Sequence, residues 1–427
     1  MMTQMIAAQK GLITPEMEEA ARREGVDPEF IREGVAEGFI VIPKNRLRRR
    51  TRVCAIGKGL RTKVNALVGT SGDRDEPETE VRKIKAAVSA GADAIMDLST
   101  GKDIDGMRFL TLEAAPVPVG SVPIYQAGIE AVEKRGGIVA MTAEDMFSAI
   151  ERQAAAGIDF MAIHCALNFD LVERLQKTGR VTDIVSRGGA FLTGWMLHNN
   201  RENPLYEDFD RVLDILREYD VVLSLGDAIR PGCIADSLDA PQIQGLLVAG
   251  ELVARAREKG VQVMVEGPGH VPLHHVETTM LLQKRLCHQA PYFVLGTLAV
   301  DVAPGYDHIA AAIGGALAGA SGADFICCVT PAEHLGLPTE EDVRVGVVAA
   351  RIAAHAADIA KCVRGAWEWD LEMAGARVLM DREAVARLAL DPAPVRRHLE
   401  KGAGETCRAC GDKCAFLLAA AYFGESS

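Results

Sequence analysis

Short apolar runs alternate with longer, charged segments through most of the chain. From about Arg52 to Leu337 the apolar runs are rich in Val and Ile, and the segments between them are rich in Ala, Glu, Lys and Arg. Runs of this length indicate buried strands, and the intervening segments are long enough to form helices. The runs recur about every 25 to 40 residues, which is the spacing of βα units. We expect strands at Lys63–Gly69, Ala94–Leu98, Pro118–Ile124, Phe160–His164, Asp183–Val185, Val221–Leu225, Val261–Glu266, Phe293–Leu298 and Phe325–Val329.

Polar residues follow nearly every apolar run, and their positions favour an α/β fold of the TIM-like (β/α)8 barrel type. In such a barrel all carboxyl strand ends meet on one face, so the residues after the strands converge on a single pocket. A doubly wound open sheet is the alternative, and it would spread them along a crevice. Because a barrel of this type has eight strands, one of the nine predicted strands is extra. The polar ends are Asp97–Thr100, Tyr125–Gln126, His164–Cys165, Ser186–Gly189, Gly226–Asp227 and Glu266–His270.

Helical segments flank the predicted barrel on both sides. Thr14-Pro15-Glu16 and Asp27-Pro28-Glu29 each combine a capping residue, a proline and an acid, which marks a helix start. Alanine and alternating charge dominate after Pro338. We therefore expect an N-terminal helical domain at 1–52, a catalytic barrel at 53–337, a C-terminal helical bundle at 338–400 and a cluster-binding tail at 401–427. The expected C-terminal helices are Glu340–Cys362, Ala366–Leu379 and Arg382–Leu390.

Composition and charge exclude several classes of protein. The 427 residues are 48% hydrophobic and 25% charged, as in globular proteins. The net charge of -12 argues against nucleic acid as a partner. No apolar run is long enough to span a bilayer, and no signal peptide is recognisable, so we expect no membrane partner and a cytoplasmic location. No P-loop, nucleophile elbow or dinucleotide fingerprint occurs, which leaves hydrolase and nicotinamide-dependent functions without support.

Three cysteines near the carboxyl end form the sequence C-R-A-C-G-D-K-C, at Cys407, Cys410 and Cys414. Three thiolates at this spacing suit a 4Fe–4S cluster whose fourth iron binds another group, such as S-adenosylmethionine. The alternative is a structural zinc site, which would normally require a fourth Cys or His nearby. The closest candidate is His398.

Two histidines lie on turns that follow neighbouring predicted strands, His270 in E-G-P-G-H and His334 in P-A-E-H. Two imidazoles from adjacent strand ends can bind one divalent metal and leave positions for substrate or water. Alternatively, both histidines cap backbone carbonyls. His274 and His275 compete as ligands, so spacing alone does not assign the metal site.

The sequence Ser186-Arg187-Gly188-Gly189 has the composition of an anion-binding turn. Arginine supplies a planar fork of donors, serine a hydroxyl, and the glycines let backbone N–H groups approach a phosphate or carboxylate. An ordinary βα turn is the alternative. The segment Gly226–Gly232 adds a second acid and a second arginine, Asp227 and Arg230, at another strand end.

Taken together, these segments resemble the phosphomethylpyrimidine synthase (ThiC) superfamily of radical S-adenosylmethionine enzymes. The resemblance runs from about Ile56 to Cys414 and consists of many long blocks in order. They are I-G-K-G-L-R-T-K-V-N from Ile56, I-M-D-L-S-T-G from Ile95, P-V-P-V-G-S-V-P-I-Y-Q-A from Pro116, V-S-R-G-G from Val185, R-P-G-C-I-A-D from Arg230, V-E-G-P-G-H-V-P from Val265, D-V-A-P-G-Y-D-H-I from Asp301 and T-P-A-E-H-L from Thr330.

The resemblance implies a β/α barrel enzyme that acts on aminoimidazole ribotide with an external electron donor. It also implies a homodimer in which the C-terminal tail of one subunit reaches the barrel of the other. Cys407, Cys410 and Cys414 would be the catalytic residues that hold the 4Fe–4S cluster, and His270 and His334 would bind an auxiliary Zn or Fe ion. The implied substrate-binding residues are Met96, Tyr125, His164, Ser186, Arg187, Gly188, Asp227, Ala228, Ile229, Arg230, Glu266 and Phe293.

Departures from the thiamin-pathway pattern indicate which reaction is catalysed. Leu67 replaces a substrate-facing Asn, Phe293 stands where a Tyr is expected, and the cysteine cluster is one residue tighter than the long form. Losing two polar groups while keeping the anion-binding turn indicates the same substrate with a different rearrangement. We therefore expect the subgroup of 5-hydroxybenzimidazole synthases, which make the lower-ligand precursor of cobalamin anaerobically. The thiamin-pathway enzyme, a zinc-dependent barrel lyase and a catalytically inactive binding or regulatory paralogue are the alternatives.

Overall fold

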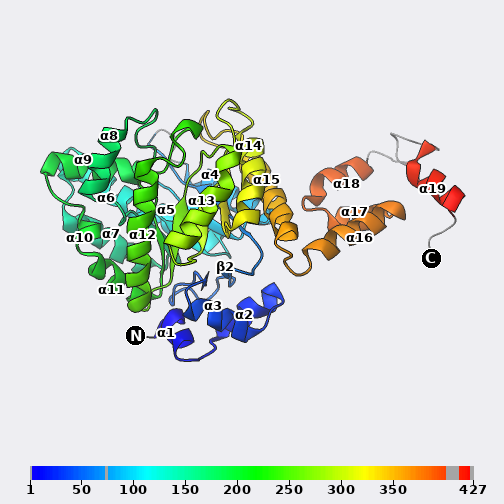
Figure 1. Ribbon diagram of the computed structural model, residues 1–427, viewed down its shortest axis with the longest axis horizontal. Coiled ribbons are helices and arrows are strands. Elements are labelled where there is room, and N and C mark those ends of the chain that lie inside the picture. The colour runs from blue at the N-terminus through cyan, green and yellow to red at the C-terminus, as the bar shows by residue number, and fades with distance from the viewer. Residues whose placement is uncertain (1, 73–75, 401–412, 424–427) are drawn as a thin grey trace. The chain divides into compact units, whose positions relative to one another are not determined.

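The structure is a computed structural model that describes residues 2–72, 76–400 and 413–423. The chain divides into two compact units, of which the first ends at Lys361 and the second begins at Cys362. Figure 1 labels the helices of both units.

The first unit is built around a closed barrel of eight parallel strands, which confirms the predicted fold class. The strands are adjacent in chain order, and β10 closes the barrel by pairing with β3, Phe325 opposite Lys63, as well as with β9. The strands are β3 (Lys63–Val68), β4 (Ala94–Asp97), β5 (Val119–Ser121), β6 (Phe160–Ile163), β7 (Val222–Leu225), β8 (Val263–Gly267), β9 (Tyr292–Leu295) and β10 (Phe325–Cys327).

Helices connect successive strands and surround the barrel (Figure 1). Their starts follow local capping chemistry: Thr142 and Thr339 each form a capping box that satisfies the first backbone N–H groups of α7 and α15. The helices of this layer are α4 (Pro77–Ser89), α5 (Ile104–Ala114), α6 (Pro123–Arg135), α7 (Ala143–Ala156), α8 (Phe169–Thr178), α9 (Arg187–Asn199), α10 (Pro204–Glu207), α11 (Phe209–Tyr219), α12 (Ala240–Glu258), α13 (Leu273–Leu286), α14 (Asp307–Ser321) and α15 (Glu340–Ala360), with short 3₁₀ turns at η1 (Ile138–Ala140) and η2 (Ile234–Asp236).

The predicted strand at Asp183–Val185 is wrong, and it is the extra strand. This segment lies in the connection between α8 and α9, where Asp183 has a φ of 43°. Only Ile184 packs against the core, and β6 pairs directly with β7, so no position in the barrel remains for a further strand. The strand predicted at Pro118–Ile124 is shorter than expected, because Pro123 begins α6.

The N-terminal residues form three helices and a two-stranded antiparallel sheet with their own small core. The expected capping residues Thr14 and Asp27 accept hydrogen bonds from backbone N–H groups at the starts of α2 and α3. A buried ion pair between Arg48 and Asp159, 2.6 Å, joins this segment to the residue preceding β6, at the amino-terminal end of the barrel. The elements are α1 (Gln4–Gln9), α2 (Pro15–Glu24), α3 (Pro28–Ala36), β1 (Ile40–Val41) and β2 (Ile56–Gly57).

Helix α15 belongs to the first unit, although the sequence-based boundary at 337 and 338 grouped it with the later helices. It packs against α14 and α4, and the Asp358 carboxylate accepts hydrogen bonds from the backbone N–H and hydroxyl of Thr62, at 2.8 and 2.6 Å. The second unit contains α16 (Ala366–Val378), α17 (Arg382–Leu388), α18 (Pro392–Glu400) and α19 (Ala415–Phe423). No described helix is long and apolar enough to cross a bilayer.

Candidate active site

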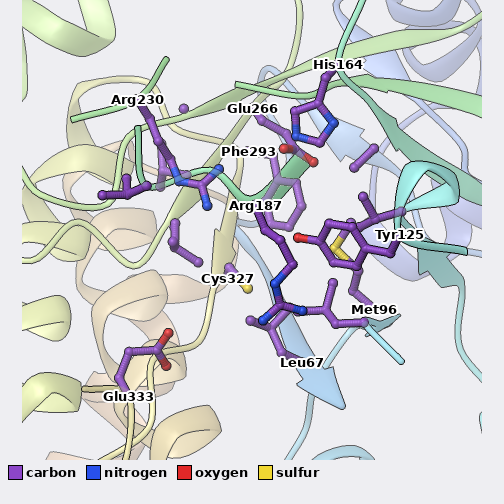
Figure 2. Close-up of a pocket in the computed structure, with 17 residues that line it drawn as sticks. Leu67, Met96, Tyr125, His164, Arg187, Arg230, Glu266, Phe293, Cys327 and Glu333 are labelled. Atoms are coloured by element: carbon purple, nitrogen blue, oxygen red, sulfur yellow. The ribbon is translucent and has the colours of Figure 1, made fainter. Parts of the chain in front are cut away.

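A cavity of about 270 Å³ opens at the carboxyl-terminal ends of the barrel strands (Figure 2). Residues at or just after the ends of all eight barrel strands contribute to it, so the strand ends converge as expected for a barrel. Its walls are Leu67, Met96, Leu98, Val122, Tyr125, Ala162, His164, Val185, Arg187, Arg230, Glu266, Gly267, Phe293, Val294, Leu295, Cys327 and Glu333.

The structure divides the expected substrate-binding residues into three groups. Ser186 and Gly188 lie beside the cavity and contact His164 rather than lining it. Asp227, Ala228 and Ile229 line a separate cavity of about 20 Å³, between the barrel wall and helices α8 and α12. The residues that line the main cavity are Met96, Tyr125, His164, Arg187, Arg230, Glu266 and Phe293.

His164 is held in a narrow slot at the cavity wall. Its side chain is nearly buried, and its Nε2 lies 3.1 Å from the hydroxyl oxygen of Ser186, the N-cap of α9. Burial, reinforced by the positive charge of Arg230, lowers the pKa of His164 to about 3. The imidazole is therefore neutral near pH 7. Its Nδ1 is buried and has no hydrogen-bond partner among the described residues.

Two arginines and an aromatic ring give one side of the cavity the character of an anion site. Arg187 is the first residue of α9, and its guanidinium lies 5.0 Å from the centre of the Tyr125 ring. The positive end of the helix dipole adds to this charge. Arg230 reaches the same cavity from the loop after β7 (Figure 2). These groups carry the charge that a phosphate or carboxylate requires, and the anion-binding role of Ser186–Gly189 stays a prediction.

Carboxylates occupy other positions around the cavity. Glu266 accepts a hydrogen bond from the Ser224 hydroxyl at 3.0 Å, and desolvation raises its pKa to about 7, opposed chiefly by Arg230. Desolvation also raises the pKa of Asp227 to about 6. A carboxyl group with a pKa near 7 can gain or lose a proton at little cost near neutral pH, as a general acid or base must.

Glu333 and Cys327 line the cavity, but neither was predicted from the sequence to be a site residue. Figure 2 shows Glu333 on the side of the cavity away from His164, and burial raises the pKa of its carboxyl group. Cys327 is the last residue of β10, where burial keeps its thiol protonated by raising its pKa. The signal for Glu333 was available in the sequence, because it lies beyond the end of the strand predicted at Phe325–Val329. Cys327 lies within that predicted strand and ends only the shorter strand that forms.

His270 and His334 lie next to each other, as a shared metal site requires. Their ring centres are 5.4 Å apart, and each Nδ1 contacts a carboxylate oxygen, of Asp301 at 2.8 Å and of Asp307 at 2.9 Å. A tetrahedral metal about 2.1 Å from each Nε2 would hold two ring centres roughly 5.3 Å apart, so the pair fits such an ion. Within residues 2–72, 76–400 and 413–423, no three His, Cys, Asp or Glu side chains form a metal-binding group.

Two of the three predicted cluster ligands, Cys407 and Cys410, lie outside the described residues. Cys414 is described and directly precedes α19.

Comparison with known proteins decides the family, because the sequence model of the family described as Radical SAM ThiC family matches residues 3–421. The chain belongs to this family. Membership implies a 4Fe–4S cluster and S-adenosylmethionine as cofactors.

Relatives match the chain over its whole length. A protein of Moorella thermoacetica named 5-hydroxybenzimidazole synthase BzaB is 70% identical over 99% of this chain and 100% of that protein. A phosphomethylpyrimidine synthase of the same organism is 57% identical over 100% of this chain and 99% of that protein. Among solved structures, a dihydropteroate synthetase is 13% identical with a TM-score of 0.41, covering 71% of this chain and 96% of that one, a similarity too weak to carry an argument.

Proposed function

We propose that this radical SAM enzyme is a 5-hydroxybenzimidazole synthase that rearranges aminoimidazole ribotide. The observation that carries the proposal is the 70% identity, end to end, with a protein of that name, against 57% for a phosphomethylpyrimidine synthase. Leu67 and Phe293, the two apolar departures from the thiamin-pathway pattern, both line the cavity. An apolar wall suits a benzenoid product, because it leaves no buried polar group unpaired against the product ring.

The residues of the cavity have distinct roles in this proposal. Arg187 and Arg230 bind the ribotide phosphate, and His164, which is neutral near pH 7, contacts the ligand from the cavity wall. Glu266 holds or releases a proton near pH 7 at the imidazole or ribose polar atoms. The apolar residues, including Met96 and Phe293, exclude water from the reacting carbons.

Cys407, Cys410 and Cys414 would hold the 4Fe–4S cluster, since three thiolates leave one iron open. When bound, the cluster and S-adenosylmethionine supply one-electron chemistry that no side chain provides. His270 and His334 would hold an auxiliary Zn or Fe ion through Nε2, with water or substrate completing its coordination.

Exposed apolar surfaces support a homodimer in which the tail of one subunit reaches the barrel of another. Helix α19, A-F-L-L-A-A-A-Y-F, contains no charged residue and exposes Tyr422 and Phe423. Separately, Val302 is 92% exposed in the loop that carries Asp301, and Leu335 is exposed directly after His334. Monomeric proteins seldom leave such surfaces in water, which favours their burial in an assembly.

The test is an anaerobic assay of the reconstituted full-length protein with aminoimidazole ribotide, S-adenosylmethionine and a low-potential reductant. We expect 5′-deoxyadenosine together with 5-hydroxybenzimidazole, identified by mass spectrometry, and neither from a Cys410→Ala variant. A pyrimidine phosphate as product would instead assign the thiamin-pathway reaction. Ribotide binding without cleavage of S-adenosylmethionine would assign an inactive paralogue.

A further inference from the structure

The carboxylates of Asp301 and Asp307 each contact two groups, one on each oxygen. Asp301 meets His270 Nδ1 through Oδ1 at 2.8 Å and accepts a hydrogen bond from the backbone N–H of Ile234 through Oδ2 at 2.9 Å. Asp307 meets His334 Nδ1 through Oδ1 at 2.9 Å and accepts from the backbone N–H of Gly305 through Oδ2 at 3.3 Å. The same arrangement therefore occurs twice, on two aspartates from neighbouring segments.

This arrangement determines which imidazole nitrogen carries the proton. An ionised carboxylate only accepts hydrogen bonds, so a neutral histidine beside it donates from Nδ1. The lone pair of each histidine is then on Nε2, the nitrogen that remains for a metal. A carboxylate behind a metal-binding histidine also fixes the ring orientation and increases the basicity of the ligating nitrogen.

We propose that Asp301 and Asp307 are the positioning residues of the two-histidine metal site, and that each must be a carboxylate rather than an amide. This inference rests on the proposed auxiliary metal at His270 and His334. An asparagine has one acceptor oxygen, and the backbone N–H of Ile234 or Gly305 is a fixed donor that would compete for it. The asparagine NH₂ would then face Nδ1 and favour the tautomer with its proton on Nε2, which cannot bind metal.

Asp301 and Asp307 differ in exposure and in the segment that their second hydrogen bond reaches. Asp307 is 3% exposed, at the first turn of α14, and its second contact stays within its own turn. Asp301 is 31% exposed, and its contact with Ile234 reaches the loop that carries Arg230, a residue of the cavity. Replacing Asp301 by a residue that has no acceptor, such as alanine, should therefore weaken ribotide binding as well as metal binding, whereas the same change at Asp307 should affect the metal alone.

The experiment measures Co²⁺ binding by its visible absorption in the full-length protein, after iron–sulfur reconstitution has occupied the cysteines. Competition with a chelator gives the dissociation constant for the parent, Asp301→Asn, Asp307→Asn and His270→Ala. We expect each asparagine variant to bind Co²⁺ about 10- to 100-fold more weakly than the parent. Asp214→Asn, at an exposed aspartate of α11, is the matched control and should bind as the parent does.

Co²⁺ affinities of both asparagine variants within twofold of the parent would overturn the inference, provided that His270→Ala removes binding. Unchanged binding in His270→Ala would refute the metal site itself, and this inference with it. If the parent protein binds Co²⁺ but forms no 5′-deoxyadenosine, this result would instead count against the proposed reaction alone. Equal ribotide affinities for Asp301→Ala and Asp307→Ala would refute the link from Asp301 to the Arg230 loop.

Discussion

Substituting alanine for Gly188 tests whether the position of His164 controls ligand binding. The imidazole of His164 lies between two glycines, and a Cβ on Gly188 would stand 2.3 Å from its Cε1 and 2.6 Å from its Nδ1. A Cβ on Gly226, on another element, would come within 3.0 Å of the same ring. The ring therefore has little space on either side.

The size of the effect follows from these distances. Non-bonded carbon atoms rest about 3.5 to 4.0 Å apart, so the Gly188→Ala variant requires a relative movement of more than about 1 Å. Overpacking of this kind costs about 1 to 3 kcal/mol, partly offset by the higher helix propensity of alanine. Displacing a ligand-contacting group by about 1 Å can reduce a reaction rate by roughly 100-fold. We expect ribotide affinity to fall at least tenfold.

Isothermal titration of the ribotide, together with thermal unfolding, measures both effects. Gly194→Ala is the matched control, because Gly194 lies in the same helix α9 and its added Cβ would meet no atom within 4 Å. It should bind the ribotide as the parent does and be slightly more stable. Parent-like affinity in Gly188→Ala would refute the view that His164 is fixed by its two glycines and contacts the ligand.

Two further predictions concern charge. Because the pKa of Glu266 is raised to about 7 from its ordinary value of 4.5, the folded protein holds an extra proton between these pH values and loses stability as the pH rises through them. At pH 8 the Glu266→Gln variant should therefore have a free energy of unfolding higher than that of the parent by at most about 3 kcal/mol, and it should unfold at a higher temperature. Near pH 4 the two proteins should be equally stable, and an equal difference at both pH values would contradict this prediction. Arg48→Met removes the ion pair of the fully buried Asp159 carboxylate, which two backbone N–H groups still contact. In urea unfolding this variant should lose about 3 kcal/mol of stability at pH 8 and less at pH 5. Arg82→Met, which breaks an exposed pair with Glu340, should cost less than about 1 kcal/mol, and a similar cost for both variants would show that burial is unimportant.

The order of elements could be predicted because it depends on local patterns. Eight of the nine predicted strands occur, and Thr14 and Asp27 cap the helices that they were expected to begin. The strand predicted at Asp183–Val185 has the same apolar composition as the true strands. It fails because a strand of a closed barrel needs a neighbour on each side, and β6 already pairs with β7.

The site could be predicted in part for the same reason. Residues at the ends of barrel strands face a common cavity, so His164 and Glu266 were identified from the apolar runs that precede them. Arg187 also lines the cavity, although the run that precedes it forms no strand. The sequence pattern did not show that Asp227 faces α8 and α12 instead of the main cavity. The direction of a side chain in a loop depends on backbone angles that no periodic pattern records.

The sequence by itself determined the parallel barrel, the family motifs and the residue types available for chemistry, because these depend on composition and spacing along the chain. Only the tertiary structure decided that Glu333 and Cys327 share a cavity with His164, and that Asp301 and Asp307 stand behind the two histidines. Those relations join segments distant in the chain, and they exist only once the strands have closed into a barrel.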